Sequence, residues 1–495
     1  MASDISKYQG ANGIHRVPLW RIGGFALNNT ATNLYLMLMG YVSFYLGGFV
    51  GMATVLASSF SMIMRLWDGV TDPFIGFLVD KTTTKFGKNR PFMVIGQVIL
   101  CITSFILFHV THLLPDNAIL RSAFFIIVSA VYYIGYTFQC VVTKSAQSAL
   151  TNDPKQRPLF AVFDAVYNTI LFTGMAALAA GVSQKYGGTF YDTGFFHDMW
   201  VPIAIMSAIF TAIAVFSIAP KDRVEFFGTG KAVKVTLKDY WETLKHNRAI
   251  QMLVVSASTD KLAMQAKTTA VTAVMFGVLA GNFALNAIIQ GMVSVPVVVL
   301  TILVIGGLAT TLGQRKGMII GSVGGIVTSL ILAALWLFGD PTSMNNGNGG
   351  LMIGFFAIAH IGLSIINGAF NNLAGNIVIP MTADCADYEV YRTGRYVPGM
   401  MGTLFSFVDK IISSFAPLIA GLVFAAVGYA DKLPDATAAY SDGLKYASIF
   451  LCYGLIVLGQ VANLIAMHFY PLTKEKMEEI RTEIDRIKNE SMKAA

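Results

Sequence analysis

Long apolar segments constrain this chain more than any other feature. Twelve largely apolar runs recur along the 495 residues, and each is long enough for a helix to cross ~30 Å of hydrocarbon. Only helices and closed barrels span membranes, and barrel strands alternate polar and apolar residues instead of forming such runs. The sequence therefore predicts an all-α membrane protein with twelve transmembrane helices. Their expected ranges are 18–47, 50–80, 91–113, 120–150, 159–184, 198–219, 249–280, 283–309, 317–338, 351–383, 397–429 and 443–470.

The charge content agrees with this class. Charged residues make up 13% of the chain, about half of the ~25% found in soluble proteins. The net charge of +7 does not require a nucleic acid, because the basic residues concentrate in short loops. The 4 cysteines lie in apolar stretches without metal-ligand spacing, which predicts free, buried thiols. We find no nucleotide-binding loop and no nucleophile–base pair, so we expect neither a primary pump nor an enzyme.

The longest hydrophilic stretch between spans divides them six and six. It covers 220–248 and predicts a cytoplasmic connector between an N-terminal six-helix bundle, 1–219, and a C-terminal one, 249–470. The charged tail, 471–495, is expected to be a cytoplasmic helix. A weak repeat supports two halves: GFLVDKTTTKFGKNRPFMVIG follows the second span and GGLATTLGQRKGMIIG follows the eighth. Two such halves predict the major facilitator fold, unless the basic loops are topology anchors alone.

Lysine and arginine also predict the orientation. They fill alternate loops, whereas the opposite loops hold little beyond Lys185 and Lys432. Cytoplasmic loops carry the excess of these residues. We therefore expect a multi-pass protein of the cell inner (plasma) membrane with both termini in the cytoplasm.

Two acidic residues inside the second span predict a cation site. Asp68 and Asp72 lie four residues apart on one helix face, ~18 Å and ~12 Å from the cytoplasmic end, with Thr71 beside them. Thr137 of the fourth span reaches a similar depth. Charges at this depth need a function or a partner, and converging oxygens suit a proton or a hard monovalent cation. The alternative is a structural ion pair with a basic residue such as Lys410.

A polar stripe on the first span predicts a substrate site. Asn28, Thr32 and Tyr35 follow at steps of four and three residues, so they share one face. Amides for hydroxyl groups and an aromatic face for C–H groups suit a sugar ring. The alternative is that these residues join helices together.

Cys140 and Lys144 of the fourth span share a face with Thr137. Lys144 would bind an anionic group of the substrate, or else pair with Asp164 or extend to the interface. Near the inner end of the second span, a charged cluster predicts a gate that holds helix ends together, with topology anchoring as the alternative. Its members are Asp80, Lys81, Lys88 and Arg90.

Three stretches carry a resemblance to a known family. RLWDGVTDPFIGFLVDKTTTKFGKNRPFMVIG resembles the helix 2–3 signature of the glycoside–pentoside–hexuronide:cation symporters of the melibiose permease type. MTADCADYEVYRTGRYVPGMMGTLFSFVDKI resembles their helix 10–11 signature, and HFYPLTKEKMEEIRTEIDRIKN resembles their C-terminal end. The similarity extends over the whole chain and implies their major facilitator fold.

The resemblance also implies site residues. Asp68, Thr71, Asp72 and Thr137 occupy the places of the family's cation site, although melibiose permease has Asn in place of Thr71, so the choice of Na⁺, Li⁺ or H⁺ stays open. Lys410 matches the family's helix 11 lysine and is expected at the substrate site.

The sugar-site positions depart further from melibiose permease. Asn28 stands for an Asp, Cys140 for an Asp and Lys144 for a Trp, while Ala165 replaces an Arg and Gly375 a Trp. More room and an added cation favour a hexuronide, such as a glucuronide conjugate, over an α-galactoside.

We therefore expect a secondary active symporter that imports a glycoside or sugar acid with a cation. The alternative is a cation-dependent transporter of lysolipids or other amphiphiles with the same fold. The expected partners are the small-molecule substrate, the coupling cation (Na⁺, Li⁺ or H⁺) and the lipid bilayer. We expect a monomer without a cofactor or nucleic acid, and no metal site other than the monovalent cation at Asp68 and Asp72.

Overall fold

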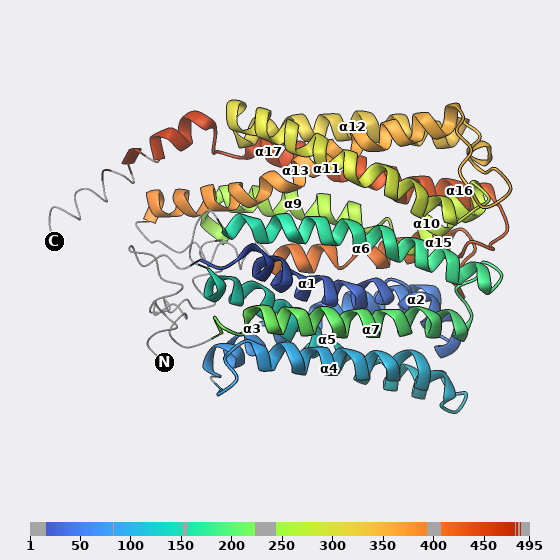
Figure 1. Cartoon of the computed structure of the whole chain (residues 1–495). Coiled ribbons are helices and arrows are strands. Elements are labelled where there is room, and N and C mark those ends of the chain that lie inside the picture. Colours follow the sequence, from blue (N-terminus) through green and yellow to red (C-terminus); the bar gives the residue numbers. More distant parts are fainter. Residues whose placement is uncertain are drawn as a thin grey trace. The chain divides into compact units, whose positions relative to one another are not determined.

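The chain folds into long helices, seen in a computed structural model (Figure 1). The structure describes residues 16–82, 84–151, 156–222, 244–393, 407–480, 482–483 and 486. Helices occupy all twelve predicted ranges within this part of the chain, which confirms the all-α membrane fold. The helices of the N-terminal part are α1 (Leu19–Met39), α2 (Val42–Tyr45), η2 (Leu46–Val50), α3 (Thr54–Lys81), α4 (Arg90–Phe105), η3 (Ile106–Val110), η4 (Thr111–Leu113), α5 (Ala118–Leu150), α6 (Arg157–Lys185) and α7 (Thr193–Ile218).

The remaining helices begin after the connector. They are α9 (Arg248–Gln265), α10 (Thr269–Thr272), η6 (Ala273–Leu279), α11 (Ala284–Leu312), α12 (Gln314–Phe338), η7 (Pro341–Met344), α13 (Phe355–Thr393), α15 (Ala416–Ala426), α16 (Asp442–Ile449), η8 (Phe450–Gly454) and α17 (Leu455–Phe469). Residues 407–413 are also helical. The predicted connector, 220–248, lies mostly outside the described residues.

Nine helices in the described part are long and apolar enough to cross a membrane, or ten when the bent pair of α9 and Thr269–Leu279 counts as one span. Helices α3 and α13 stand at the second and tenth predicted spans but carry more polar residues than this set. Large apolar side chains are exposed on the helices, as at Ile119 (82%) and Phe338 (88%). Such exposure suits contact with lipid.

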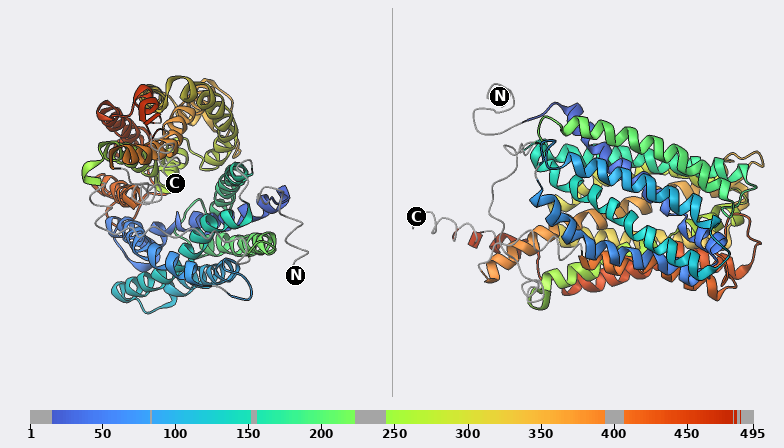
Figure 2. Two further views of the ribbon diagram at one scale, coloured as in Figure 1. Left: turned by 90° about the vertical axis from the view of Figure 1, so that its left-hand side faces the viewer. Right: turned by 90° about the horizontal axis from the view of Figure 1, so that it is seen from below.

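The chain divides into two compact units. Unit 1 comprises Met1–Gly230 and Tyr429–Thr437, and unit 2 comprises Lys231–Gly428 and Ala438–Ala495. Within each unit the long helices run along one common direction, and the end-on view shows them gathered into a bundle (Figure 2). The first span of each unit passes into a π-helical turn, η2 in unit 1 and η6 in unit 2, which is in keeping with the weak repeat in the sequence.

Close backbone packing joins α4 to α5 in unit 1. A Cβ atom on Gly96 would lie 3.0 Å from the carbonyl oxygen of Gly135. A side chain at this position would therefore force the helices apart. An apolar core that includes Phe25, Met93 and Val142 fills the adjacent interior.

The segment Tyr429–Thr437 completes unit 1, although it follows the spans of unit 2 in sequence. The Thr54 amide donates to the Ala430 carbonyl oxygen at 2.9 Å. The Tyr191 hydroxyl donates to the Leu433 carbonyl oxygen at 2.7 Å, and the Thr189 hydroxyl donates to Asp435 Oδ2 at 2.7 Å. These bonds fix the segment against the start of α3 and the loop before α7.

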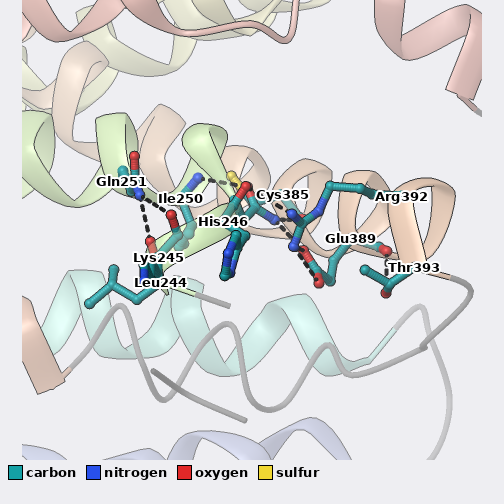
Figure 3. A network of polar contacts seen from close by, with 10 residues as sticks. Leu244, Lys245, His246, Ile250, Gln251, Cys385, Glu389, Arg392 and Thr393 are labelled. Carbon is teal, nitrogen blue, oxygen red and sulfur yellow. Dashed lines mark hydrogen bonds and ion pairs between the residues drawn. The ribbon is translucent and has the colours of Figure 1, made fainter. Parts of the chain in front are cut away.

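A polar network holds the start of α9 against the end of α13 in unit 2 (Figure 3). Asn247 caps α9 by accepting from the Ile250 amide at 3.1 Å, and its Nδ2 donates to Glu389 Oε2 at 2.8 Å. Arg392 donates to Glu389 Oε1 at 3.0 Å and to the His246 carbonyl oxygen at 2.9 Å. Buried Glu389 is therefore paired and hydrogen-bonded, as a buried carboxylate requires.

Candidate cation and substrate site

The predicted cation residues meet within unit 1. Thr137 on α5 donates its hydroxyl hydrogen to Asp68 Oδ1 on α3 at 2.7 Å. The Thr71 hydroxyl donates to the backbone carbonyl oxygen of Asp68 at 3.2 Å. Asp68 is 6% exposed and Thr137 is fully buried, while Asp72 is half-buried. The structure thus joins a carboxylate and a hydroxyl from separate spans in an interior position.

This arrangement has the chemistry of a cation site. The carboxylate of Asp68 and the hydroxyl oxygens of Thr71 and Thr137 are hard oxygen donors, and Asp72 follows one helical turn later on α3. Burial increases the attraction between a carboxylate and a cation, because the interior screens charge less than water does. The site can therefore hold a small monovalent cation or a proton.

The predicted substrate stripe on α1 is packed inside unit 1. Asn28 Nδ2 donates to Thr143 Oγ1 at 2.8 Å, and the Thr32 hydroxyl donates to the Asn28 carbonyl oxygen at 2.9 Å. Tyr35 is fully buried, and its hydroxyl oxygen accepts from Gln97 Nε2 at 3.3 Å. The contacts of Asn28 and Tyr35 join α1 to α5 and α4, as the helix-joining alternative expects, whereas that of Thr32 stays within α1. The substrate role of the stripe stays a prediction.

The adjacent face of α1 carries a polar ladder that the sequence reading missed. Asn29 Nδ2 donates to Asp164 Oδ1 on α6 at 2.6 Å, and Asn33 Nδ2 donates to Asn168 Oδ1 at 2.8 Å. Asn168 Nδ2 also donates to Asp164 Oδ2 at 3.0 Å. All four residues are half-buried, so their amides and carboxylate have remaining surface for a polar ligand. The signal in the sequence was the paired spacing of four residues on both helices.

Other predicted residues are partly described. Cys101 and Cys140 are half-buried, so the expectation of four buried thiols is wrong for these two, because they lie on faces that the unit does not cover completely. Cys385 and Cys452 are buried as expected.

The side chains of Lys144, Asp80 and Lys81 lie outside the described part. Lys410 lies in unit 2, next to Asp409.

Two basic residues of the predicted gate, Lys88 and Arg90, contact an acid that was not selected from the sequence. Asp222, directly after α7, accepts from the backbone amides of Lys88 (3.2 Å), Asn89 (3.0 Å) and Arg90 (2.9 Å). Arg90 Nε also lies 3.5 Å from Asp222 Oδ2. Asp222 is fully buried, so it serves as an anionic cap for the first turn of α4.

A glycine makes this cap possible. Gly87 has a φ of +104°, and a Cβ atom there would lie 2.2 Å from Asp222 Oδ2. Any larger residue would be strained by the positive φ and would also clash with the carboxylate of Asp222. The basic loop is therefore fixed to the end of α7 through backbone hydrogen bonds.

Comparisons with known proteins support the architecture. The isoprimeverose transporter of Lactiplantibacillus pentosus is 23% identical over 94% of this chain and 92% of its own length. The glucuronide carrier protein homolog of Escherichia coli K12 is 24% identical over 94% of this chain and 95% of its own. Among solved structures, the nucleoside transporter NupG aligns with a TM-score of 0.59 at 13% identity, covering 91% of this chain and 100% of that one. This last likeness shows the fold alone.

A family model decides the assignment. The model of the family described as MFS/sugar transport protein matches residues 24–474. This match and the sequence relatives confirm the resemblance to the glycoside–pentoside–hexuronide symporters. The chain belongs to this MFS/sugar transport family of the major facilitator superfamily and is a multi-pass membrane transporter, not an enzyme.

Proposed function

We propose that the protein is a secondary active symporter that takes up a glycoside or sugar acid together with a cation. The observation that carries this proposal is the buried hydrogen bond from Thr137 to Asp68, at 2.7 Å within membrane spans. A carboxylate in this position needs a functional reason, and a coupling cation supplies one. The proposed cation is Na⁺, Li⁺ or H⁺, bound by Asp68 and Asp72 with the hydroxyl oxygens of Thr71 and Thr137.

The half-buried polar ladder supports a substrate rich in hydroxyl groups. Its four side chains offer amide donors and carboxylate or amide acceptors at one level of α1 and α6. Such groups match sugar hydroxyls, which both donate and accept. The relatives named for isoprimeverose and glucuronide transport favour a glycoside or hexuronide over the lysolipid considered from the sequence. Lys144 would then bind the uronic acid carboxylate.

Transport would follow alternating access, in which two halves expose a central site to each side in turn. The basic loops support a placement of both termini in the cytoplasm of a cell with an inner (plasma) membrane. We propose that one chain suffices for transport.

Uptake into proteoliposomes tests the coupling. The purified chain is reconstituted, and radiolabelled glycosides with and without a uronic acid group are offered under an imposed Na⁺, Li⁺ or H⁺ gradient. We expect one gradient to drive accumulation, and Asp68→Asn to abolish it while the protein stays folded. Asp198→Asn, which changes an acid paired with Lys185 at 2.6 Å, serves as the matched control. Equal concentrative uptake by Asp68→Asn and the unmodified chain would refute the cation site.

A further inference from the structure

Another buried acid lies inside a membrane span, in unit 2 and apart from the candidate site in unit 1. Asp260 on α9 is 5% exposed. Within the described part of the chain its hydrogen-bond partner is Gln460 on α17, whose Nε2 donates to Asp260 Oδ1 at 2.7 Å. A carboxylate buried with one neutral donor is poorly compensated. The carboxylate of Asp260 therefore lacks full compensation within the described residues.

The orientation of Gln460 is fixed by its neighbours. Its Nε2 also donates to Asn371 Oδ1 at 3.1 Å, and Asn371 Nδ2 donates in turn to Asn367 Oδ1 at 3.0 Å. Asn367 Nδ2 then donates to Ser329 Oγ at 2.8 Å. This chain of amides uses both hydrogens of Gln460 Nε2, so the side chain cannot rotate without loss of a bond.

The other end of the same amide is unsatisfied. Gln460 is fully buried, and its Oε1 has no hydrogen-bond partner in the part of the chain that the structure describes. A buried acceptor without a donor is rare and needs an explanation. A hydrogen-bond donor to Gln460 Oε1 is therefore missing among the described residues.

The charged groups on the helices around Asp260 have other contacts or other positions. Lys261, the next residue on α9, forms an ion pair with Asp409. Helix α13 carries no charged residue between His360 and Asp384, and His360 accepts from Trp336 at 3.2 Å. The sequence of α15 carries no titratable residue, and that of α17 carries His468, two turns beyond Gln460. Lys410 follows Asp409 on its helix.

We infer that Asp260 is a proton-binding site whose acid form makes a two-bond pair with Gln460. A carboxylic acid and a primary amide pair in this way when the amide N–H donates to the acid carbonyl and the acid O–H donates to the amide oxygen. The first bond is present, from Gln460 Nε2 to Asp260 Oδ1. A proton on Oδ2 would supply the second, to Gln460 Oε1. One proton thus neutralises the buried carboxylate and satisfies the buried acceptor.

The position of the pair suits a site that affects transport. Asp260 lies in the last two turns of α9, and the span bends by 49° between α9 and Thr269–Leu279. Discontinuous helices are where transporters place ion sites. The proton would couple to uptake or regulate it, a consequence that rests on the proposed function, whereas the binding site itself does not.

Infrared difference spectroscopy of the purified full chain tests the site without transport. We expect a carboxylic acid C=O band that titrates with pH, that Asp260→Asn removes, and that Asp198→Asn retains. Gln460→Met should move the same band to the frequency of a weakly hydrogen-bonded acid. It should also move the midpoint of the titration, because the ionised form loses one bond to Gln460 and the acid form loses two. An unchanged band in Asp260→Asn would overturn the inference, as would a band in Gln460→Met with unchanged frequency and midpoint.

Transport then separates this inference from the proposed function. In proteoliposomes, Asp260→Asn should keep substrate exchange but lose the pH dependence of net uptake. A chain that shows the titrating band but no glycoside uptake would refute the proposed function and leave the proton site standing. Uptake whose pH dependence is identical in Asp260→Asn and the unmodified chain would refute the coupling or regulatory role.

Discussion

The hydroxyl of Thr137 and the carboxylate of Asp68 lie 2.7 Å apart, donor to acceptor, although 69 residues separate them in sequence. This bond joins α5 to α3 inside unit 1. A hydrogen bond to a charged group contributes about 1.5–3 kcal/mol, enough for the Thr137 hydroxyl to orient the carboxylate of Asp68. The same hydroxyl adds an oxygen to the proposed cation site.

Replacement of Thr137 by valine should weaken cation binding. Valine keeps the shape but removes the hydroxyl, so we expect the cation concentration for half-maximal uptake to rise by about tenfold, the equivalent of ~1.4 kcal/mol. Thr137→Ser should stay close to the unmodified value. The measurement is initial uptake at graded cation concentrations. Equal dependence in the valine and serine variants would mean that the hydroxyl is not a ligand.

Loss of Asp222 should destabilise the start of α4. Asp222→Ala leaves the amides of Asn89 and Arg90 without their acceptor in a buried place, at a cost of about 2–4 kcal/mol. We expect a lower melting temperature in detergent and faster hydrogen exchange at residues 88–93. Asp198→Ala, which removes an acid beside largely exposed Lys185, should change stability little. If both variants melt alike, the cap is unimportant.

Lys221 should make stability depend on pH. Burial lowers the pKa of Lys221 from 10.5 to about 8. The unfolded chain then binds this proton more tightly than the folded one. The free-energy cost of burying the charged amine is therefore complete below about pH 8 and disappears as the pH rises to about 10.5. We expect Lys221→Met to raise stability by about 1–3 kcal/mol at neutral pH and by little at pH ~10.5. Thermal melts at both pH values check this, and a gain that does not depend on pH would contradict it.

Release of the segment Tyr429–Thr437 should follow from loss of Asp435. Its Oδ2 accepts from Thr189, and its Oδ1 accepts from the Thr437 amide at 2.9 Å. We expect Asp435→Ala to expose Leu433, which is 7% exposed. A Leu433→Cys probe should then react with a water-soluble maleimide at least tenfold faster in the Asp435→Ala background, the equivalent of ~1.4 kcal/mol of lost anchoring. Asp442→Ala, which changes an acid outside the segment, is the control. Equal labelling rates in all backgrounds would show that Asp435 does not hold the segment.

Lys144 should distinguish charged from neutral substrates. Lys144→Gln is expected to weaken binding of a uronic acid glycoside by roughly ten- to a hundredfold, since a charge-assisted contact contributes about 1.5–3 kcal/mol. A neutral glycoside of the same size should bind as before. Asp164 already accepts from two amides, so the double variant with Asp164→Asn should not restore transport. Rescue without preference between the two substrates would instead assign Lys144 to Asp164.

The sequence predicted the spans and the similar depth of Asp68 and Thr137, which do meet, because both follow from local rules. Hydropathy locates a span, and a rise of 1.5 Å per residue gives the depth of Asp68 and Thr137. The sequence alone did not distinguish two neighbouring faces of α1. Asn28 and Asn29 differ by one residue, or about 100° of rotation, and only packing decides that the first lies against Thr143 while the second meets Asp164.

Asp222 escaped prediction for a different reason. Its partners are backbone amides more than 130 residues earlier, and backbone groups leave no residue-type signature. The pair of Asp260 and Gln460 is similar, because 200 residues separate the two. Long-range polar pairs of this kind depend on how helices pack, which a single sequence does not specify.

The docking of Tyr429–Thr437 onto unit 1 has a consequence for biosynthesis. The six spans of that unit leave the ribosome first, yet the segment that receives Tyr191 and Thr189 is translated some 240 residues later. Until then the nascent bundle lacks these hydrogen-bond partners at one end. During synthesis, domains generally fold as units and the N-terminal domain folds first. In this chain, however, the first unit is complete only after the eleventh span has been made. A chain truncated before Tyr429 should consequently be a poor folder and a good substrate for membrane proteases.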